Sequence, residues 1–302
     1  MDLNQYLKNL QVPNGRVDVV LDTDAYNEID DQYAISLMLK SPQRFSVKAI
    51  VSAPFFNNNS TGPRDGMEKS YAEILNLLAL MKSDFSEVYR GSTAFLTDEK
   101  TPVISEGANK IVQLAQTYSP ENPLYIVAIG AITNVASALL IAPEIAQNIV
   151  VVWLGGHAIE WGKNDEFNCY QDVSAVRVVF GSACPLVLLP CAGVVDKVTT
   201  TKYELEHWLK GKNELCDYLV KHTTEEAESY AKDKPWSRVI WDITAVLWFF
   251  GDQKVMASRL IPCPVPEYDH RWAQNPNGKL INYVYTINRD KAFEILFNTL
   301  SK

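Results

Sequence analysis

The sequence predicts an α/β fold built on a mostly parallel central sheet with helices on both faces. Short runs rich in β-branched residues alternate along the 302-residue chain with segments of helical length, as in parallel strands joined by helical crossovers. The strand candidates are nearly continuous apolar runs, which is typical of strands covered on both faces. No internal repeat or Gly/Ser linker divides the chain, so we expect a single domain over residues 1–302.

The predicted strands are apolar runs that occur in both halves of the chain. They are residues 17–21, 47–52, 124–129, 149–154, 186–189 and 281–287. The predicted helices lie between them, where apolar residues recur at helical spacing or turn residues mark a helix start or end. They cover residues 31–40, 66–81, 106–118 and 133–140, a charge-rich helical stretch over 203–232, an apolar one over 239–250, and a final helix from residue 289.

Charge and hydropathy exclude two kinds of partner. The 28 Lys and Arg residues are outnumbered by 36 Asp and Glu residues, and no basic run could follow a phosphate backbone. We therefore expect no nucleic-acid partner. No apolar run approaches the ~18 residues that span a bilayer, and the first residues lack the apolar centre of a secretory signal. We expect no membrane partner and a cytoplasmic location, with the five widely spaced cysteines reduced.

Five acidic residues follow the first predicted strand in the segment DTDAYNEIDD. They are Asp22, Asp24, Glu28, Asp30 and Asp31. They lie at the carboxyl end of a strand, which is the edge where open α/β sheets bind ligands. Carboxylates this close repel one another unless solvent or a cation intervenes, and hard divalent cations take oxygen ligands of this kind. The segment therefore indicates a metal site, although Asp30 and Asp31 alone could simply begin a helix.

The D-x-D pattern after a first strand leaves a second enzyme class open. Haloacid-dehalogenase-type phosphatases, which depend on Mg²⁺, also begin with a nucleophilic Asp and a second acid two residues later. Those enzymes usually continue with a small residue and then Thr or Val, whereas Ala25, Tyr26 and Asn27 follow here. A Mg²⁺-dependent phosphatase is the alternative interpretation of this segment.

Further motifs follow the acidic segment in a fixed order. Asp22, Asp24, Asp30, Asp31 and Ala34 match a D-x-D…D-D-x-x-A pattern, with AYNEI in place of a three-residue loop between the two acidic pairs. AIGAITNVA contains G-x-x-T-N, EFNCYQD contains E-F-N before an Asp that begins a helix, and VIWDITAV is similar to H-D-P-x-A-x-A. Together these motifs, spread over residues 22–246, resemble the inosine-uridine nucleoside hydrolase family, whose fold is Rossmann-like.

This resemblance implies a calcium-dependent enzyme that hydrolyses the N-glycosidic bond of ribonucleosides with an activated water. It implies Ca²⁺ ligands at Asp24, Asp31, Asp242 and the backbone carbonyl of Thr133, and it makes Asp24 the base that takes the proton from water. The implied substrate-binding residues are Asp30, Glu166, Phe167, Asn168 and Trp241. Asn57 and Asn58, in the FFNNN run after the second strand, are further candidates, and a plain polar loop is the alternative interpretation.

Trp241 stands where many members of the family have His, so it is a catalytic candidate of a different kind. An indole is a poor proton donor, but its face can stack on a leaving base, and this favours purine nucleosides. The alternative is that Trp241 is simply a core residue. A nucleoside-binding protein that has lost the chemistry is also possible, although the intact acids argue against it. The resemblance further implies a small-molecule nucleoside substrate and a homodimer or homotetramer.

Overall fold

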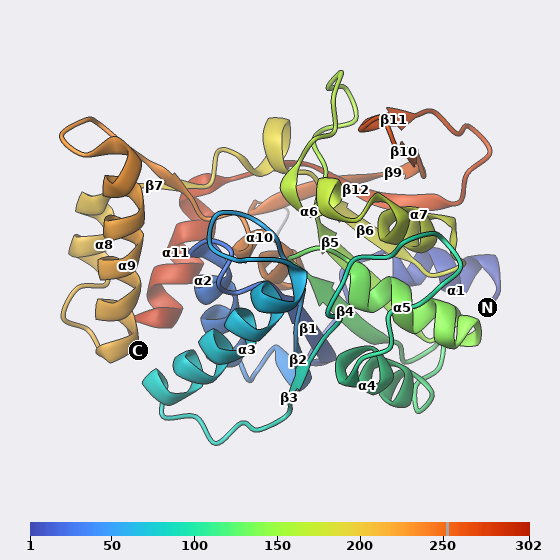
Figure 1. Ribbon diagram of the computed structural model, residues 1–302, viewed down its shortest axis with the longest axis horizontal. Coiled ribbons are helices and arrows are strands. Elements are labelled where there is room, and N and C mark those ends of the chain that lie inside the picture. Colours follow the sequence, from blue (N-terminus) through green and yellow to red (C-terminus); the bar gives the residue numbers. More distant parts are fainter. Residues whose placement is uncertain (252–253) are drawn as a thin grey trace.

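A central sheet organises the computed structural model of the chain, which describes residues 1–251 and 254–302 (Figure 1). Its strands are β1 (Val17–Thr23), β2 (Phe45–Ser52), β3 (Val88–Arg90), β4 (Leu124–Ala128), β5 (Ile149–Leu154), β6 (Leu186–Leu189), β9 (Met256–Pro262) and β12 (Leu280–Ile287). Their order across the sheet is β3-β2-β1-β4-β5-β6-β12-β9. Neighbouring strands are parallel apart from β12 and β9, which are antiparallel.

Two small sheets and the helices complete the described structure. β7 (Thr199–Thr200) pairs with β8 (Arg238–Val239), and β10 (Val265–Glu267) pairs with β11 (Arg271–Ala273). The α-helices are α1 (Leu3–Asn9), α2 (Asp30–Leu39), α3 (Pro63–Leu80), α4 (Glu106–Ala115), α5 (Thr133–Ile141), α6 (Phe167–Gln171), α7 (Val173–Gly181), α8 (Lys202–Trp208), α9 (Glu214–Ala231), α10 (Ile243–Leu247) and α11 (Arg289–Leu300).

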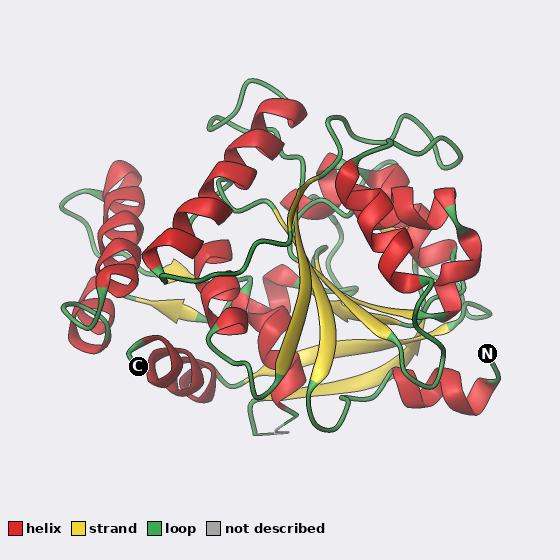
Figure 2. Ribbon diagram, turned by 90° about the horizontal axis from the view of Figure 1, so that it is seen from below, coloured by secondary structure: helices red, strands yellow, loops and turns green. Residues whose placement is uncertain are grey.

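Helices cover both faces of the sheet, and each face has its own apolar core (Figure 2). β5 contributes to both cores, because successive side chains of a strand point to opposite faces. Val150 and Val152 lie in the core shared with α2, α3, α10 and α11, whereas Val151 and Trp153 lie in the core shared with α4, α5 and α7. The prediction of a mostly parallel sheet with helices on both faces is confirmed.

The second half of the chain differs from the prediction in two places. The helical stretch over 203–232 is two helices, α8 and α9, because Gly211 adopts a left-handed conformation (φ 76°) and the side chain of Asn213 caps α9. The apolar stretch over 239–250 begins as a strand, since Val239 pairs with Thr199, and its α-helix is confined to α10. Strand pairing between distant segments thus overrode the local helical pattern.

Several short or peripheral elements were not predicted, including α1, β3, β10, β11 and the edge strand β9. β9 is partly exposed and contains charged and polar residues, so its run does not look like the buried strands. Within residues 1–251 and 254–302, no helix is both long enough and apolar enough to cross a membrane.

Candidate active site

The candidate site forms where β1 ends at the carboxyl edge of the sheet. Asp22 and Thr23 are the last residues of β1, and Asp24 follows directly; all three side chains are buried. β1 lies between β2 and β4, so Asp24 emerges near the middle of the sheet. Gly130, just after β4, leaves room for it, because a Cβ at that position would lie 2.9 Å from the Asp24 carboxylate.

Three further aspartates come together at this edge. The carboxylates of Asp30 and Asp31, in the first turn of α2, and of Asp242, just before α10, offer oxygens within 4.8 Å of one another. The Thr23 hydroxyl donates a hydrogen bond to Asp31, and the backbone N–H of Trp241 donates one to Asp30 Oδ2 at 3.1 Å. The positions of Asp30 and Asp31 are therefore determined by the protein itself.

Burial makes negative charge costly throughout this group. It raises the pKa of Asp31 to about 8, with a further contribution from Asp30, and it raises the pKa of Asp22 to about 7 against the Asn134 hydrogen bond. It also raises the pKa of Asp24 and Asp242, and the neighbouring aspartates add to both shifts. Among the described residues, neither carboxylate oxygen of Asp24 has a hydrogen-bond partner. Buried, unpartnered carboxylates of this kind fit a hard cation.

A cavity of about 240 Å³ opens beside these carboxylates. The predicted site residues that line it are Asp24, Asp30, Asp31, Glu166, Phe167, Asn168, Trp241 and Asp242. These residues come from the end of β1 and from the starts of α2, α6 and α10. The structure therefore brings together in one cavity most of the residues that the motifs single out.

Glu166 and Asn168 are held in place by the backbone around them. Glu166 caps α6, because its carboxylate accepts hydrogen bonds from the N–H groups of Gly156, Asn168 and Cys169 at 2.7, 3.0 and 2.9 Å. Burial nevertheless raises its pKa. The amide of Asn168 donates to the carbonyls that follow or end β4 and β5, those of Ile129 and Leu154. The two side chains are thus preorganised at the cavity wall.

Three predicted site residues are not among those that line the cavity. Thr133, the first residue of α5, is buried, and its hydroxyl donates to Asp172 Oδ2 at 2.7 Å. Asn57 lies behind the cavity wall, where its amide donates to Asn27 Oδ1 at 2.5 Å, and Asn27 does line the cavity. Asn58 is exposed. The roles of these three residues in binding stay predictions.

Trp241 contacts both the core and the cavity, and its role toward a substrate base stays a prediction. Its side chain is half-buried and packs against the core, and it also lines the cavity next to Asp242. His157 lines the same cavity from the loop after β5, and its Nδ1 accepts a hydrogen bond from the Ala192 N–H at 3.3 Å. An aromatic face and an imidazole therefore border the space beside the acids.

Comparison with known proteins identifies the family. The sequence model for inosine-uridine preferring nucleoside hydrolases matches residues 19–294, which include every predicted site residue. The chain belongs to the inosine-uridine preferring nucleoside hydrolase family. The family resemblance that the motifs indicate is confirmed. The prediction that the chain is an enzyme, a hydrolase acting on ribonucleosides, is also confirmed.

Relatives of this nucleoside hydrolase differ in the bases named for them. A pyrimidine-specific ribonucleoside hydrolase, RihA, of Salmonella arizonae is 28% identical over 242 residues, covering 72% of this chain and 73% of that protein. Among solved structures, a purine-preferring ribonucleoside hydrolase from Gardnerella vaginalis has a TM-score of 0.75 at 18% identity, covering 94% of this chain and 98% of that one. A plant nucleoside hydrolase, PpNRh1, has a TM-score of 0.76 at 18% identity, covering 94% of this chain and 99% of that one.

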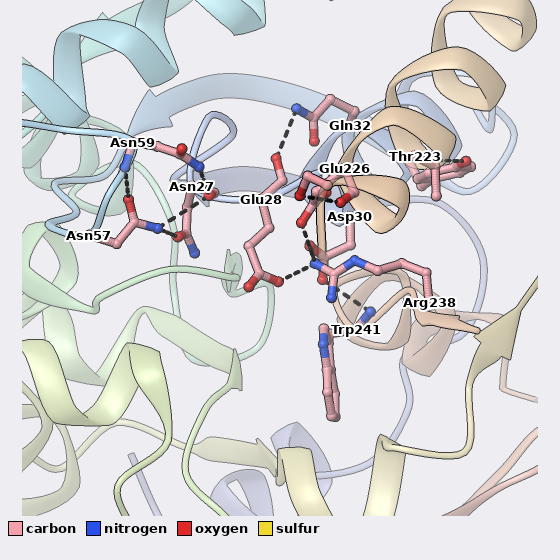
Figure 3. A network of polar contacts seen from close by, with 12 residues as sticks. Asn27, Glu28, Asp30, Gln32, Asn57, Asn59, Thr223, Glu226, Arg238 and Trp241 are labelled. Carbon is pink, nitrogen blue, oxygen red and sulfur yellow. Dashed lines mark hydrogen bonds and ion pairs between the residues drawn. The ribbon is translucent and has the colours of Figure 1, made fainter. Parts of the chain in front are cut away.

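The nucleoside hydrolase site also contains residues to which the motifs gave no role. Glu28, one of the five acids noted after the first strand, lines the cavity, and so do Asn27 from the same AYNEI segment and Cys191 after β6. Arg238 lies next to Glu28 and Asp30 without lining the cavity itself (Figure 3). The sequence offered one signal for Arg238, which is its position three residues before Trp241. No local pattern could show that Arg238 pairs with an acid on a distant segment.

Proposed function

We propose that the chain hydrolyses the N-glycosidic bond of ribonucleosides to free base and ribose, with Ca²⁺ as cofactor and a preference for purine nucleosides. The observation that carries the proposal is the pair of unpartnered, buried oxygens of Asp24 beside the acids that line the same cavity. A group of carboxylates this poorly compensated has little use in a protein that only binds nucleosides, because it favours a cation and a developing positive charge.

The donor set fits calcium. Asp24, Asp31 and Asp242 would supply carboxylate oxygens and Thr133 its backbone carbonyl, and hard oxygen donors of both kinds suit Ca²⁺. When bound, Ca²⁺ supplies Lewis acidity that lowers the pKa of a nearby water and orients it toward the sugar. Burial of the aspartates supports this set, since without a cation their charged forms are disfavoured.

In the reaction, a water oxygen forms a bond to C1′ of the ribose while the bond from C1′ to the base nitrogen breaks. Asp24 takes the proton from the water, and the electron pair of the broken bond leaves with the base, which gains a proton from solvent. The sugar acquires positive charge in the transition state, much as in glycoside hydrolysis, and the surrounding carboxylates stabilise it. Asp30, Glu166 and Asn168 bind the ribose hydroxyls.

Preference for purines depends on Trp241. Its indole borders the cavity beside Asp242, where it can stack on a leaving base, and a fused purine ring offers more stacking area than a pyrimidine. The Salmonella relative is described as pyrimidine-specific and the Gardnerella structure as purine-preferring, so the relatives do not decide between the bases. The proposed purine preference therefore depends on the tryptophan at position 241.

A panel of nucleosides, assayed with and without a chelator, tests the proposal. We expect free base and ribose to be released from inosine and guanosine, slowly from uridine, and hardly at all after chelation until Ca²⁺ is added back. Phosphate release from mononucleotides or sugar phosphates with Mg²⁺, without base release, would favour the phosphatase instead. Nucleoside binding without turnover would favour a silent binding protein.

The proposal extends to the compartment and the oligomeric state of the enzyme. All five cysteines are free and buried, which supports a reducing compartment such as the cytoplasm. Family resemblance favours a homodimer or homotetramer. Light scattering of the purified enzyme measures its mass in solution, and a monomer would contradict this part of the proposal.

A further inference from the structure

Arg238 links three carboxylates that come from two distant parts of the chain (Figure 3). Its guanidinium forms an ion pair with Glu28, and Nη2 lies 3.3 Å from Glu226 Oε1 and 3.9 Å from Asp30 Oδ1. The Arg238 side chain is only 11% exposed. A planar guanidinium is suited to contacting several carboxylates at once, and burial makes each of these attractions stronger than it would be in water.

The three acids have different relations to the active site. Glu28 belongs to the loop of residues 25–29, the AYNEI segment, which is longer than the corresponding loop of the family pattern. Glu28 also lines the cavity. Asp30 begins α2 and also lines the cavity. Glu226 belongs to α9 and is not among the lining residues. Arg238 therefore connects two groups that face the substrate space with one helix outside it.

Other hydrogen bonds anchor the loop of residues 25–29, and they involve groups other than the Glu28 carboxylate. The amides of Asn57 and Asn59 donate to Asn27, and the Gln32 amide donates to the carbonyls of Ala25 and Glu28 at 2.6 and 3.3 Å. These bonds fix the backbone of the loop. The carboxylate of Glu28 is fixed through its ion pair with Arg238.

Electrostatics gives Arg238 a specific effect on the cavity. Burial by itself lowers the pKa of the guanidinium, but Asp30, Glu28 and Glu226 outweigh this and raise its pKa, so Arg238 stays charged. Without that charge, Glu28, Asp30 and Glu226 would repel one another, and Glu28 and Asp30 would be free to relieve the repulsion by moving apart, into the cavity or outward with the loop.

We propose that Arg238 is a positioning residue of the nucleoside hydrolase, which holds Glu28 and Asp30 against the substrate while Glu226 anchors it from α9. The inference rests on the proposed function, where Asp30 binds ribose hydroxyls. Asp24, Asp31 and Asp242 do not contact Arg238 in this arrangement, so its removal impairs substrate binding more than the chemical step.

Steady-state hydrolysis of inosine by Arg238→Met and Arg177→Met tests this role. Arg177 is the matched control, because it also pairs with two acids, Glu99 and Glu267, but lies on α7 away from the cavity. Arg238→Met should raise KM about tenfold or more with kcat changed less than about threefold, whereas Arg177→Met should leave KM within about twofold. Arg238→Lys should recover part of the loss, since it restores the charge without the fork.

A double-mutant cycle with Glu226→Gln separates positioning from general stability. Glu226→Gln alone should raise KM about threefold, and it should add nothing in the Arg238→Met background, because it acts through Arg238. If Arg238→Met fails to fold, Arg238→Lys and Glu226→Gln, alone and combined, give the same cycle. An unchanged KM in Arg238→Met, an equal rise in Arg177→Met, or additive effects in the cycle would overturn the inference. Hydrolysis by the unmutated enzyme tests the proposed function separately.

Discussion

Two neighbouring groups of carboxylates at the same edge of the sheet, one partly exposed and one buried, are compensated in opposite ways. In the first group, Glu28, Glu226 and one oxygen of Asp30 surround a cation that the chain itself supplies, Arg238. In the second group, Asp24, Asp31 and Asp242 line the cavity together, and the two oxygens of Asp24 have no partner in the described chain. Asp30 belongs to both groups, since its carboxylate also lies close to Asp31 and Asp242.

The difference indicates which group does chemistry. Ion pairs with a fixed arginine hold side chains in place, and a group so paired is poorly suited to accept a proton or bind a mobile ion. Carboxylates without a cation of their own are costly to bury, and they are retained where an external cation or a positively charged transition state compensates them. We therefore propose a positioning role for the first group and a catalytic role for the second, and mutation and metal removal test that division.

The largest effect should come from the second group. Asp24→Ala removes the proposed base and a metal ligand together, so turnover of inosine should fall by several orders of magnitude while the fold survives. Asp18→Ala is the control, because Asp18 lies near the start of the same strand, β1, and pairs there with Lys48 at 3.1 Å. Near-normal hydrolysis by Asp24→Ala, measured by release of free base, would show that the chemistry is elsewhere.

Metal removal should make the stability of the folded protein fall with pH, through the buried aspartates at this edge of the sheet. In the metal-free protein, burial raises the pKa of Asp30, Asp22 and Asp31 to about 6, 7 and 8, above the usual value of 3.8. The folded state then holds protons that the unfolded state releases, so stability is greatest at low pH and falls as pH rises from about 4 to about 8. Thermal unfolding of chelated protein should show this fall, and Ca²⁺ should restore stability most at the higher pH.

Calcium that has no effect on the unfolding temperature at pH 8 would contradict the metal assignment. A chelated protein that is equally stable across this pH range would show that other groups already compensate these acids. The same titration with Mg²⁺ should give a smaller effect, because Mg²⁺ tolerates fewer protein ligands and less flexible geometry than Ca²⁺.

Trp241 should give an intermediate effect, because it contacts the carboxylates through its backbone and the cavity through its side chain. Its backbone N–H is bonded to Asp30, while its indole faces the cavity. Trp241→Ala should cost about 1–3 kcal/mol of transition-state stabilisation on inosine or guanosine, by analogy with stacking of bases on aromatic side chains elsewhere. The loss should be much smaller on a nitrophenyl riboside, whose leaving group needs no protonation. Equal losses on both substrates would mean that Trp241 only supports the helix, and faster hydrolysis of uridine than inosine by the unmutated enzyme would exclude the purine preference.

The smallest effect should come from the loop after β2, which contains Asn57 and Asn58 and contacts the loop of residues 25–29 from outside the cavity. Asn57→Ala removes a side-chain hydrogen bond to Asn27, and one such bond contributes about 1 kcal/mol, so KM for inosine should rise by up to about fivefold. Asn58→Ala should change KM less, because Asn58 is exposed. A larger effect at Asn58 would show that this loop contacts the sugar directly.

Much of the fold and of the site could be predicted because the signals are local. The buried strands β1, β4, β5 and β6 are continuous apolar runs, and parallel strands present their carboxyl ends at one edge. The acids after β1 and the E-F-N segment after β5 therefore had to lie near that edge. The start of α10 and the edge strand β9 were less predictable, since pairing with distant segments determines where they begin and end. The break between α8 and α9 had a local signal, Gly211 and the cap Asn213, which the charge-rich helical pattern obscured.

The sequence by itself determined the family, the sheet and most of the residues that line the cavity. Only the tertiary structure decided how their charges are compensated. Glu28 and Arg238 are 210 residues apart, and no periodicity or motif relates two side chains at that separation. Their contact exists because α2, α9 and β8 pack at one edge of the sheet, and burial there makes an unpaired charge far more costly than it would be in water.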